Sequence, residues 1–520
     1  MKKLLWNTFC LLLIASRTAI PCTSIVAGRL TTVDGSVLFG HNEDDSGRRV
    51  VNVWLVPRKI HQKGDVVYLV EGGQVPQVQE TWAYLWFQMN GLKFSDQYMN
   101  EWGVTIASDS CPSREDQPDL TDGGISYMLR RIVAERAKTA RQGVEIAGGL
   151  LDQFGYASSG RTMVICDNRE GWILSIAAGK HWVAQRVPDD EVVVLPNTYV
   201  IRQVDFKDSK NFITSRDNVM DYAIRRGWYK RRANKPFDFA YAYMPIPKEG
   251  SKFLERGYDT RQWRGHQLLT GITTSVEEAK ENGLPFSVKP NRKLIIQDIT
   301  TILRDHFEGT EYGTAVVQQP LFISEEGACK ICKGLPREII VNPNNTEERT
   351  ICTMTTQFST VAQLRTDMPV PIGSLLWMCM GRPDCGVYVP WYAGITELPE
   401  GFQNTPGVHD PVIALEKHFD SFPGTFDYNP HANFWIYNDL ENLADAHYPK
   451  VIDKIQMNWL EIEDKLFDRQ ASYERFALQL WEENPKKANE FLTQWTVATT
   501  EKTLRIAKQL TREIKTDWYR

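Results

Sequence analysis

The stretch from Cys22 to Gly28 constrains this chain most, because it begins where an N-terminal export signal ends. Upstream lie two lysines, a largely apolar run from Leu4 to Ala15, and then small or polar residues. This order is typical of a secretory signal peptide, and the apolar run is shorter than the roughly 20 residues of a permanent membrane span. We therefore expect residues 1–21 to be a signal peptide with a propeptide, and the protein to be periplasmic or extracellular.

A cysteine at the mature N-terminus has a specific chemistry. If processing ends at Cys22, that residue carries both a thiol and a free α-amine. An α-amine has a pKa of about 7.7–8.0, so near neutral pH it can accept the proton of its own thiol. Nucleophile and base would then lie on one residue. The alternatives are the lipid-attachment cysteine of a lipoprotein, and a disulfide or core cysteine.

The residues before Cys22 bear on its processing. Pro21 and Ala19 fit a lipid-attachment signal poorly, and Pro21 is not the small residue that signal cleavage prefers. Cleavage after Ala15 or Ser16 fits better and leaves a short propeptide. The sequence therefore predicts a second step, autocatalytic in one interpretation, that releases Cys22.

Blocks in a fixed order connect this chain to a known family. The blocks begin with Cys22–Ser24, Asp34–Ser36 and Phe39–Asp44, and continue with Met99–Val104, Pro196–Arg202, Tyr258–Arg264 and Trp377–Gly394. Together they resemble the cysteine dipeptidases among the N-terminal-nucleophile hydrolases, a group that includes secernins and has penicillin V acylases and bile salt hydrolases as distant relatives. The resemblance implies an exported dipeptidase that cleaves dipeptides through a thioester on Cys22, with no metal and no organic cofactor.

The resemblance also implies catalytic roles. Asp44 would accept a hydrogen bond from the α-amine of Cys22, Asn197 would donate to the oxyanion, and Arg261 would polarise the thiol. Each has a simpler interpretation: Asp44 and Asn197 as turn residues, and Arg261 as an ion-paired arginine. Arg264 is a near-alternative to Arg261 that spacing leaves open.

Four further residues are candidates for substrate binding. Ser110 stands where the acylases have a second oxyanion donor, although the donor is a backbone N–H in another interpretation. Asp109 and Arg114 would bind the free amine and the free carboxylate of a dipeptide, unless they are solvated loop charges. His41 stands where the acylases have an arginine, so its role is left open.

Composition and cysteine count add limits. The net charge of −5 over 520 residues argues against a nucleic-acid partner. Beyond Cys22, seven cysteines remain after the signal, so at least one should be unpaired. We expect a local disulfide among Cys329, Cys332 and Cys352, with zinc as the minor alternative, and a second bridge between Cys379 and Cys385.

Periodicity alone indicates an α+β protein, and the resemblance implies a four-layer αββα sandwich. Residues 22–443 would form the catalytic domain, with an insertion at about 325–350, and residues 444–520 a helical region packed on it. Strands are expected at 23–27, 37–40, 50–55, 66–69, 81–85, 104–108, 162–166, 172–177, 181–187, 192–195, 352–358 and 374–379. Helices are expected within 122–154, and at 217–230, 298–307, 451–467, 473–482 and 488–514.

Other functions stay open from the sequence. The same machinery suits an acylase or amidase that cleaves non-peptide amides. A lipid-anchored binding protein and a secernin-like member without peptidase activity are further alternatives. Small peptides are the expected partners, with no stable membrane span, and a homo-oligomer is compatible with the sequence.

Overall fold

A computed structural model of the chain describes residues 22–45, 49–94, 96–231, 235–246, 259–310, 312–313, 342–344, 348–404 and 407–518. The expected signal peptide and propeptide, most of the expected insertion, and Cys329 and Cys332 lie outside the described residues. Among the helices that it describes, none combines the length and apolar character that a membrane crossing needs.

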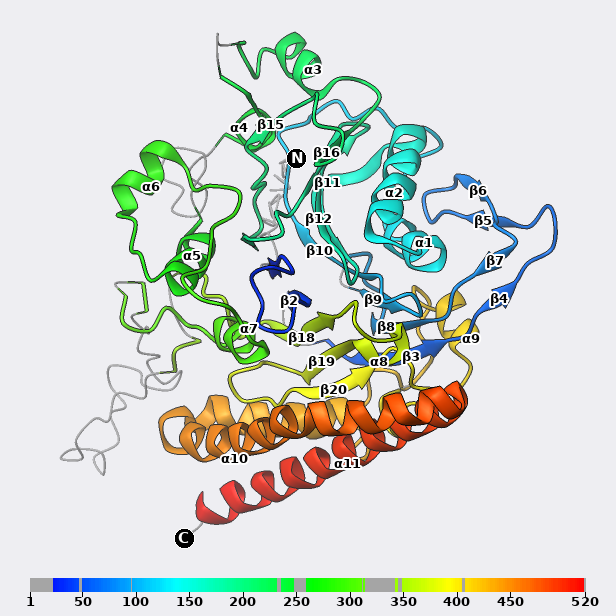
Figure 1. The fold of residues 1–520 in the computed structure, drawn as a ribbon, viewed down its shortest axis with the longest axis vertical. Coiled ribbons are helices and arrows are strands. Elements are labelled where there is room, and N and C mark those ends of the chain that lie inside the picture. The colour runs from blue at the N-terminus through cyan, green and yellow to red at the C-terminus, as the bar shows by residue number, and fades with distance from the viewer. Residues whose placement is uncertain are drawn as a thin grey trace, which may run out of the picture.

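A six-stranded antiparallel sheet carries the N-terminal block at its centre (Figure 1). Its strand order is β14 (Val192–Leu195), β1 (Thr23–Ala27), β2 (Val37–Asp44), β18 (Thr356–Leu364), β19 (Ser374–Met380) and β20 (Val389–Tyr392). Every residue of these strands is buried, because both faces of the sheet are covered. Cys22 directly precedes β1 and so lies at one end of the sheet's interior.

A second antiparallel sheet has eight strands. Their order is β16 (Phe212–Thr214), β13 (Trp182–Arg186), β12 (Gly171–Gly179), β11 (Tyr156–Cys166), β10 (Thr105–Ser110), β9 (Gln97–Asn100), β8 (Tyr84–Met89) and β3 (Val51–Val56). Three small ribbons complete the strands: β4 (Lys59–Ile60) with β7 (Glu80–Thr81), β5 (Val66–Tyr68) with β6 (Gln74–Pro76), and β15 (Gln203–Val204) with β17 (Phe237–Asp238).

The two large sheets pack face to face between helices (Figure 1). Phe87 of β8 stacks on Phe358 of β18 with ring centroids 5.6 Å apart. Helices α1 (Met128–Arg136) and α2 (Ala140–Phe154) cover the outer face of the eight-stranded sheet, and α5 (Thr260–Thr270) and α7 (Ile296–Leu303) cover that of the six-stranded sheet. A Cβ on Gly40 would lie 2.5 Å from Ile299 Cγ2, so α7 approaches β2 closely only because residue 40 is glycine. The expected α+β class is confirmed.

Shorter helices lie in the connections. They are α3 (Val219–Arg225), α4 (Phe239–Tyr243), α6 (Val276–Asn282), α8 (Val370–Gly373) and α9 (Pro411–Glu416).

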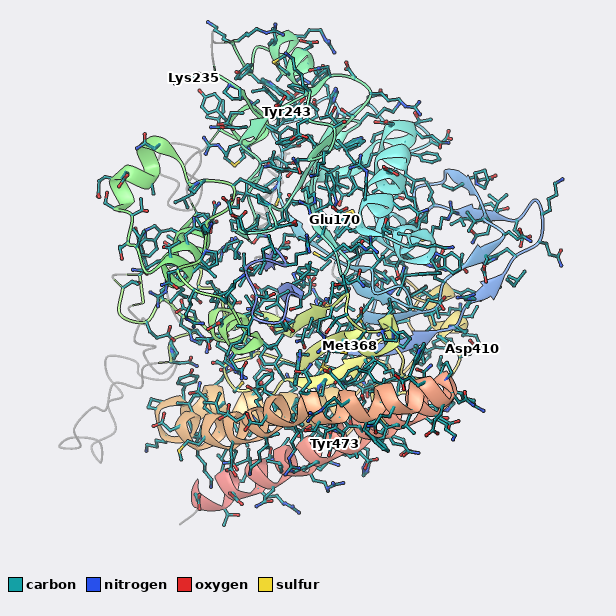
Figure 2. All side chains as sticks on the ribbon, viewed as in Figure 1. Glu170, Lys235, Tyr243, Met368, Asp410 and Tyr473 are labelled. Atoms are coloured by element: carbon teal, nitrogen blue, oxygen red, sulfur yellow. The ribbon has the colours of Figure 1, made fainter. Side chains whose placement is uncertain are left out.

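Two long helices, α10 (Asn433–Glu483) and α11 (Pro485–Trp518), run side by side along the six-stranded sheet (Figure 1). Tyr473 of α10, labelled in Figure 2, stacks on Trp495 of α11 with ring centroids 4.2 Å apart. Glu474 accepts two hydrogen bonds from Arg365, at 2.7 and 2.6 Å, and this buried ion pair ties α10 to the loop after β18.

Several expected elements differ from the structure. The expected break between helices 451–467 and 473–482 is wrong, because residues 468–472 contain no helix breaker and α10 continues through them. The strand expected at 352–358 begins only at Thr356, and the helix expected at 217–230 ends at Arg225. Strand β2 continues to Asp44 rather than ending at Gly40, since its polar residues pair with both neighbouring strands.

The expected bridge between Cys379 and Cys385 is wrong, because both are free, buried thiols. Cys379 lies within β19, whereas Cys385 lies in the loop beyond it, where its thiol donates to the carbonyl of Arg382. Cys352 is also a free, buried thiol.

Candidate active site

Cys22 lies against the end of β2, where its thiol contacts a carboxylate and a backbone carbonyl. It is only 3% exposed, and its Sγ donates to Glu43 Oε1 at 3.5 Å and to the carbonyl of Asp44 at 3.7 Å. Consecutive side chains of a strand point to opposite faces. Glu43 therefore shares the inter-sheet face with His41, and Asp44 shares the helix-covered face with Asn42, whose amide donates to Leu303 of α7.

The electrostatic surroundings keep the Cys22 thiol protonated. Burial raises its pKa well above the usual value, and the nearby carboxylates of Glu43, Asp109 and Asp44 raise it further. The thiol is therefore not preformed as a thiolate at neutral pH. A cation beside a thiol has the opposite effect and lowers its pKa. The thiol needs a base that removes its proton as it attacks.

Asp44 is a buried acid whose carboxylate lacks hydrogen-bond donors. In the part of the chain that the structure describes, neither of its oxygens has a hydrogen-bond partner. Burial raises the pKa of Asp44 well above its usual value, against the lowering effect of the positive charge of Arg261. An unpaired buried carboxylate is costly, so this position is suited to a cation that arrives with processing or with substrate.

Arg261 connects Cys22 to Asn197. The N-cap Asp259 starts α5 and accepts from the Arg261 backbone, which places Arg261 in the first turn. One guanidinium nitrogen, Nη1, donates to the carbonyl of Cys22 at 2.8 Å and to Asn197 Oδ1 at 2.9 Å. Asp259 accepts from the other two guanidinium nitrogens, at 3.3 and 3.2 Å. Arg264, by contrast, forms a two-bond pair with Asp305 at 2.9 and 2.7 Å.

The amide of Asn197 presents a donor without an acceptor. Its Oδ1 faces Arg261, so its Nδ2 points away from the guanidinium, and this buried nitrogen has no partner among the described residues. A preoriented donor beside a nucleophile is the feature that stabilises an oxyanion.

A polar network extends from Cys22 across the gap between the sheets. Ser24 Oγ lies 2.8 Å from His41 Nδ1 and donates to Asp109 Oδ2 at 2.8 Å, and His41 Nε2 lies 3.1 Å from Glu43 Oε2. Burial raises the pKa of Asp109 to about 6, against the lowering effects of His41 and Ser24. The second oxygen of Asp109, Oδ1, has no partner in the described chain.

Comparisons with known proteins identify the family of this chain. The profile described as peptidase family C69 matches residues 113–461. The chain belongs to peptidase family C69. It is therefore a cysteine-type peptidase.

Named relatives of this C69 peptidase cover most of its length. A probable dipeptidase of Latilactobacillus sakei is 24% identical over 454 residues, which cover 82% of this chain and 89% of the relative. A probable dipeptidase of Salmonella dublin is 25% identical over 417 residues, covering 78% and 88%. A probable dipeptidase B of Streptococcus pyogenes serotype M1 is 23% identical over 462 residues, covering 85% and 84%.

Two solved structures give weak matches at 11% sequence identity. Penicillin V acylase from Agrobacterium tumefaciens aligns with a TM-score of 0.30 and covers 69% of this chain and 82% of its own. A mutant conjugated bile acid hydrolase from Clostridium perfringens aligns with a TM-score of 0.27, covering 69% and 89%.

Among the described cysteines of the C69 peptidase, Cys22 is distinguished by its neighbours. The hydroxyl of Thr23 is a further buried polar atom that has no hydrogen-bond partner in the described chain, in addition to the buried polar atoms of Asp44, Asp109 and Asn197. The other described thiols are also buried, and burial raises the pKa of each. The thiol of Cys111 lies close to the same region and donates to the carbonyl of Pro196 at 3.7 Å. Cys22 is the candidate nucleophile because, among the described cysteines, it combines a thiol bonded to Glu43 with a carbonyl bonded to Arg261.

Two of the expected substrate-binding residues lie elsewhere. Arg130 of α1 donates to the Ser108 hydroxyl at 2.7 Å, so Ser108 and Ser110 share the helix-covered face of β10, opposite Asp109. Arg114 lies over the Trp228 ring, 5.1 Å from its centroid, and lines a cavity of about 1250 Å³. Asp109 instead contacts Ser24 between the sheets, so Asp109 and Arg114 do not join in one pocket.

Sequence reasoning did not assign Glu43 or Ser24 to the site. Both lie within blocks that were recognised, and both follow from strand alternation once β2 is extended to Asp44. Glu43 then shares a face with His41, and Ser24 opposes His41 in the register of β1 and β2.

Proposed function

We propose that this C69 peptidase is an N-terminal-nucleophile dipeptidase in which Cys22, freed by removal of residues 1–21, attacks the peptide bond. One observation carries the proposal: Cys22 borders buried polar groups whose hydrogen bonds are unmet in the described chain, on Asp44, Asp109 and Asn197. The order of layers, helices, two sheets and helices, suits an N-terminal-nucleophile hydrolase. The relatives named probable dipeptidases support the substrate class.

The mechanism begins with proton transfer within one residue. The α-amine of Cys22 accepts the thiol proton as Sγ attacks the carbonyl carbon, and the carbonyl π electrons move to oxygen. Asn197 Nδ2 donates to that oxyanion. Because Ser110 faces the helices, the second donor in this scheme is a backbone N–H. Asp44 accepts a hydrogen bond from the ammonium that forms.

The second half of the reaction reverses these roles. The ammonium returns a proton to the leaving amine, the C–N bond breaks, and a thioester remains on Cys22. Water then attacks the thioester carbonyl while the α-amine accepts its proton. The C–S bond breaks, the acid leaves, and the thiol recovers its proton.

The charge balance of the site favours substrates with a free amine. The carboxylates of Glu43, Asp44 and Asp109 act on Cys22. Two buried guanidinium groups oppose them, those of Arg161 and of Arg261, and Arg261 is also paired with Asp259. The ammonium of processed Cys22 compensates one negative charge, and a dipeptide's ammonium compensates another. N-acylation of the substrate removes that second cation.

Export and domain organisation belong to the same proposal. Residues 1–21 would direct the chain to the periplasm or the extracellular space and be removed there. Residues 22–443 would form the catalytic domain, and residues 444–520 would pack on it.

Substrate comparison tests this function. We expect kcat/KM for a free dipeptide to exceed that for its N-acetyl derivative by about 10- to 100-fold, since a hydrogen bond to a charged group contributes about 1.5–3 kcal/mol. A dipeptide amide, which keeps the amine and loses the carboxylate, is the control for carboxylate recognition. Faster hydrolysis of N-acylated amines than of dipeptides would instead identify an acylase or amidase.

A further inference from the structure

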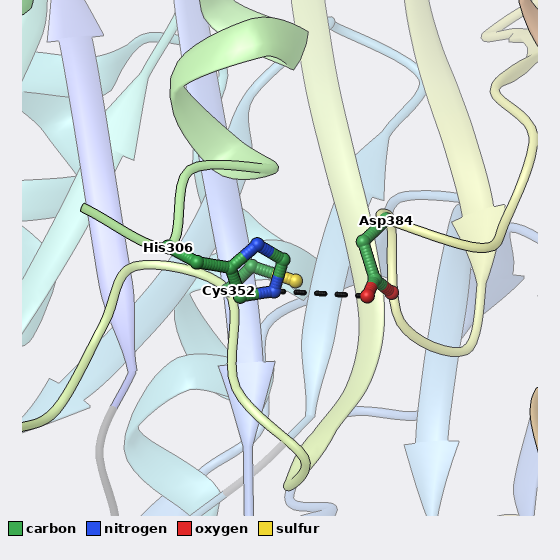
Figure 3. A group of neighbouring side chains, drawn as sticks. All are labelled: His306, Cys352 and Asp384. Carbon is green, nitrogen blue, oxygen red and sulfur yellow. Dashed lines mark ion pairs between the residues drawn. The ribbon is translucent and has the colours of Figure 1, made fainter. Parts of the chain in front are cut away.

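We propose that His306, Cys352 and Asp384 form a metal site, with Zn²⁺ as the best-suited ion, separate from the reacting atoms at Cys22. One donor atom from each residue lies within 4.8 Å of the other two, and the side chains point toward one another (Figure 3). All three residues are buried, with exposed fractions of 3%, 0% and 1%. The set therefore has the ligand types and closeness of a protein metal site.

Three loops from different parts of the chain bring these residues together. His306 follows α7, Cys352 precedes β18, and Asp384 lies between β19 and β20. The backbone N–H of Cys352 donates to the carbonyl of Asp305 at 3.0 Å, which fixes two of the loops to each other. Backbone contacts as well as side-chain contacts therefore hold these loops together.

The donor chemistry favours zinc. An imidazole nitrogen, a thiolate and a carboxylate are all ligands of Zn²⁺, and a thiolate disfavours the harder Mg²⁺ and Ca²⁺. His306 Nε2 lies 3.6 Å from Asp384 Oδ2, so both atoms face the same point. On the other side of the ring, His306 Nδ1 lies 3.1 Å from Glu308 Oε1. A carboxylate on the outer nitrogen orients a metal-binding histidine in this way.

The guanidinium group of Arg382 lies next to Asp384 but does not occupy the space between the three donor atoms. Arg382 Nε donates to Asp384 Oδ1 at 2.6 Å, and Oδ2, on the side of His306, accepts from the Tyr448 hydroxyl at 3.1 Å. The same guanidinium lies 2.7 Å from Asp445 and 3.9 Å from Glu441, so three carboxylates share one arginine.

A fourth ligand is close to the other three. Asn344 Oδ1 lies 3.1 Å from His306 Nε2, and Asn344 Nδ2 donates to Asp384 Oδ2 at 3.1 Å. Metal binding releases the proton of His306 Nε2 and that of the Cys352 thiol to solvent, and it replaces the His306–Asn344 hydrogen bond by a bond from Nε2 to the ion. The amide oxygen of Asn344, or a water, then completes a tetrahedral shell.

The position indicates a structural role near the active site. Asn42 of β2 donates to the carbonyls of Leu303 and Ile351, both at 2.9 Å, and these residues belong to two of the converging segments. Asp44 lies two residues after Asn42 in β2, and it is paired with Thr356 in the register of β2 and β18. A bound metal would therefore hold the frame on which Asp44 is placed.

Metal content of the mature full-length enzyme tests the proposal. After purification without metal-affinity steps from zinc-supplemented cells, we expect one zinc per chain by mass spectrometry of the elements, and loss of that zinc in Cys352→Ser. Glu308→Gln changes an exposed side chain and should weaken zinc affinity by about 10- to 100-fold, the usual effect of losing a histidine's outer carboxylate. Cys385→Ser, at another buried free thiol, is the matched control and should keep the zinc.

A cobalt experiment gives a readout independent of activity and of stability. Co²⁺ added to the apo-enzyme should produce a thiolate-to-cobalt charge-transfer band in the wild type and in Cys385→Ser. Wild-type enzyme that binds neither zinc nor cobalt would overturn the proposal and leave the cluster as a buried ion pair. Full zinc content in Cys352→Ser would overturn it equally.

Discussion

Replacing Cys22 by alanine is expected to lower kcat for dipeptide hydrolysis by about 10⁴- to 10⁶-fold, the range found when a nucleophile is removed from a peptidase. Among the described thiols, that of Cys22 donates to the Glu43 carboxylate, and the carbonyl of the same residue accepts from Arg261, which also contacts Asn197. The variant should fold normally, because alanine differs from cysteine by the loss of one sulfur atom and introduces no polar atom at the buried position. Steady-state rates on a dipeptide, with circular dichroism as the folding check, measure the effect.

The control for this experiment is Cys166→Ala, which removes another buried free thiol from the middle of the eight-stranded sheet. It should leave kcat close to the wild-type value. Activity retained in Cys22→Ala and lost in Cys166→Ala would move the nucleophile away from the N-terminal block.

Asn197→Ala is expected to lower kcat by about 10²- to 10³-fold with little change in KM, as for loss of one oxyanion donor. The reason is geometric: Arg261 occupies Asn197 Oδ1, so Nδ2 is left to donate beside Cys22. An oxyanion exists only in the transition state and the intermediate, so the fall in kcat should not be accompanied by a comparable change in KM.

The matched variant is Asn168→Ala, whose amide donates to the Arg365 carbonyl at 3.1 Å and which is not among the residues that contact Cys22 or Arg261. It should keep kcat within about threefold of wild type, as expected for a half-buried position outside the site. A rise in KM with unchanged kcat in Asn197→Ala would show that Asn197 binds the ground state, and would contradict its oxyanion role.

The sequence predicted the parts of the site that lie within recognised blocks. The Cys22 block supplied the candidate nucleophile, and the Pro196 and Tyr258 blocks supplied Asn197 and Arg261. The structure brings these three together through the two Arg261 Nη1 hydrogen bonds. Spacing alone did not separate Arg261 from Arg264, since one helical turn divides them and only tertiary packing pairs Arg264 with Asp305.

The remaining parts depend on which face of a strand a residue occupies. Polar residues at 41–44 read as a turn, because the sequence does not show that both neighbouring strands pair with them. For the same reason Ser110 was matched to an oxyanion donor by counting residues, whereas the register of β10 turns it to the helices. The two-helix C-terminal packing was likewise obscured, since charged residues dominate the exposed faces of α10 and α11.

The central claim is that the catalytic base is the α-amine of Cys22, and the intact mass of the mature exported protein tests it most directly. We predict a mass that corresponds to a chain beginning at Cys22 with an unmodified amine, confirmed by N-terminal sequencing. A mature chain that begins before Cys22, or one that carries an acyl group on Cys22, would remove the base from the mechanism. Either of those masses would contradict the account.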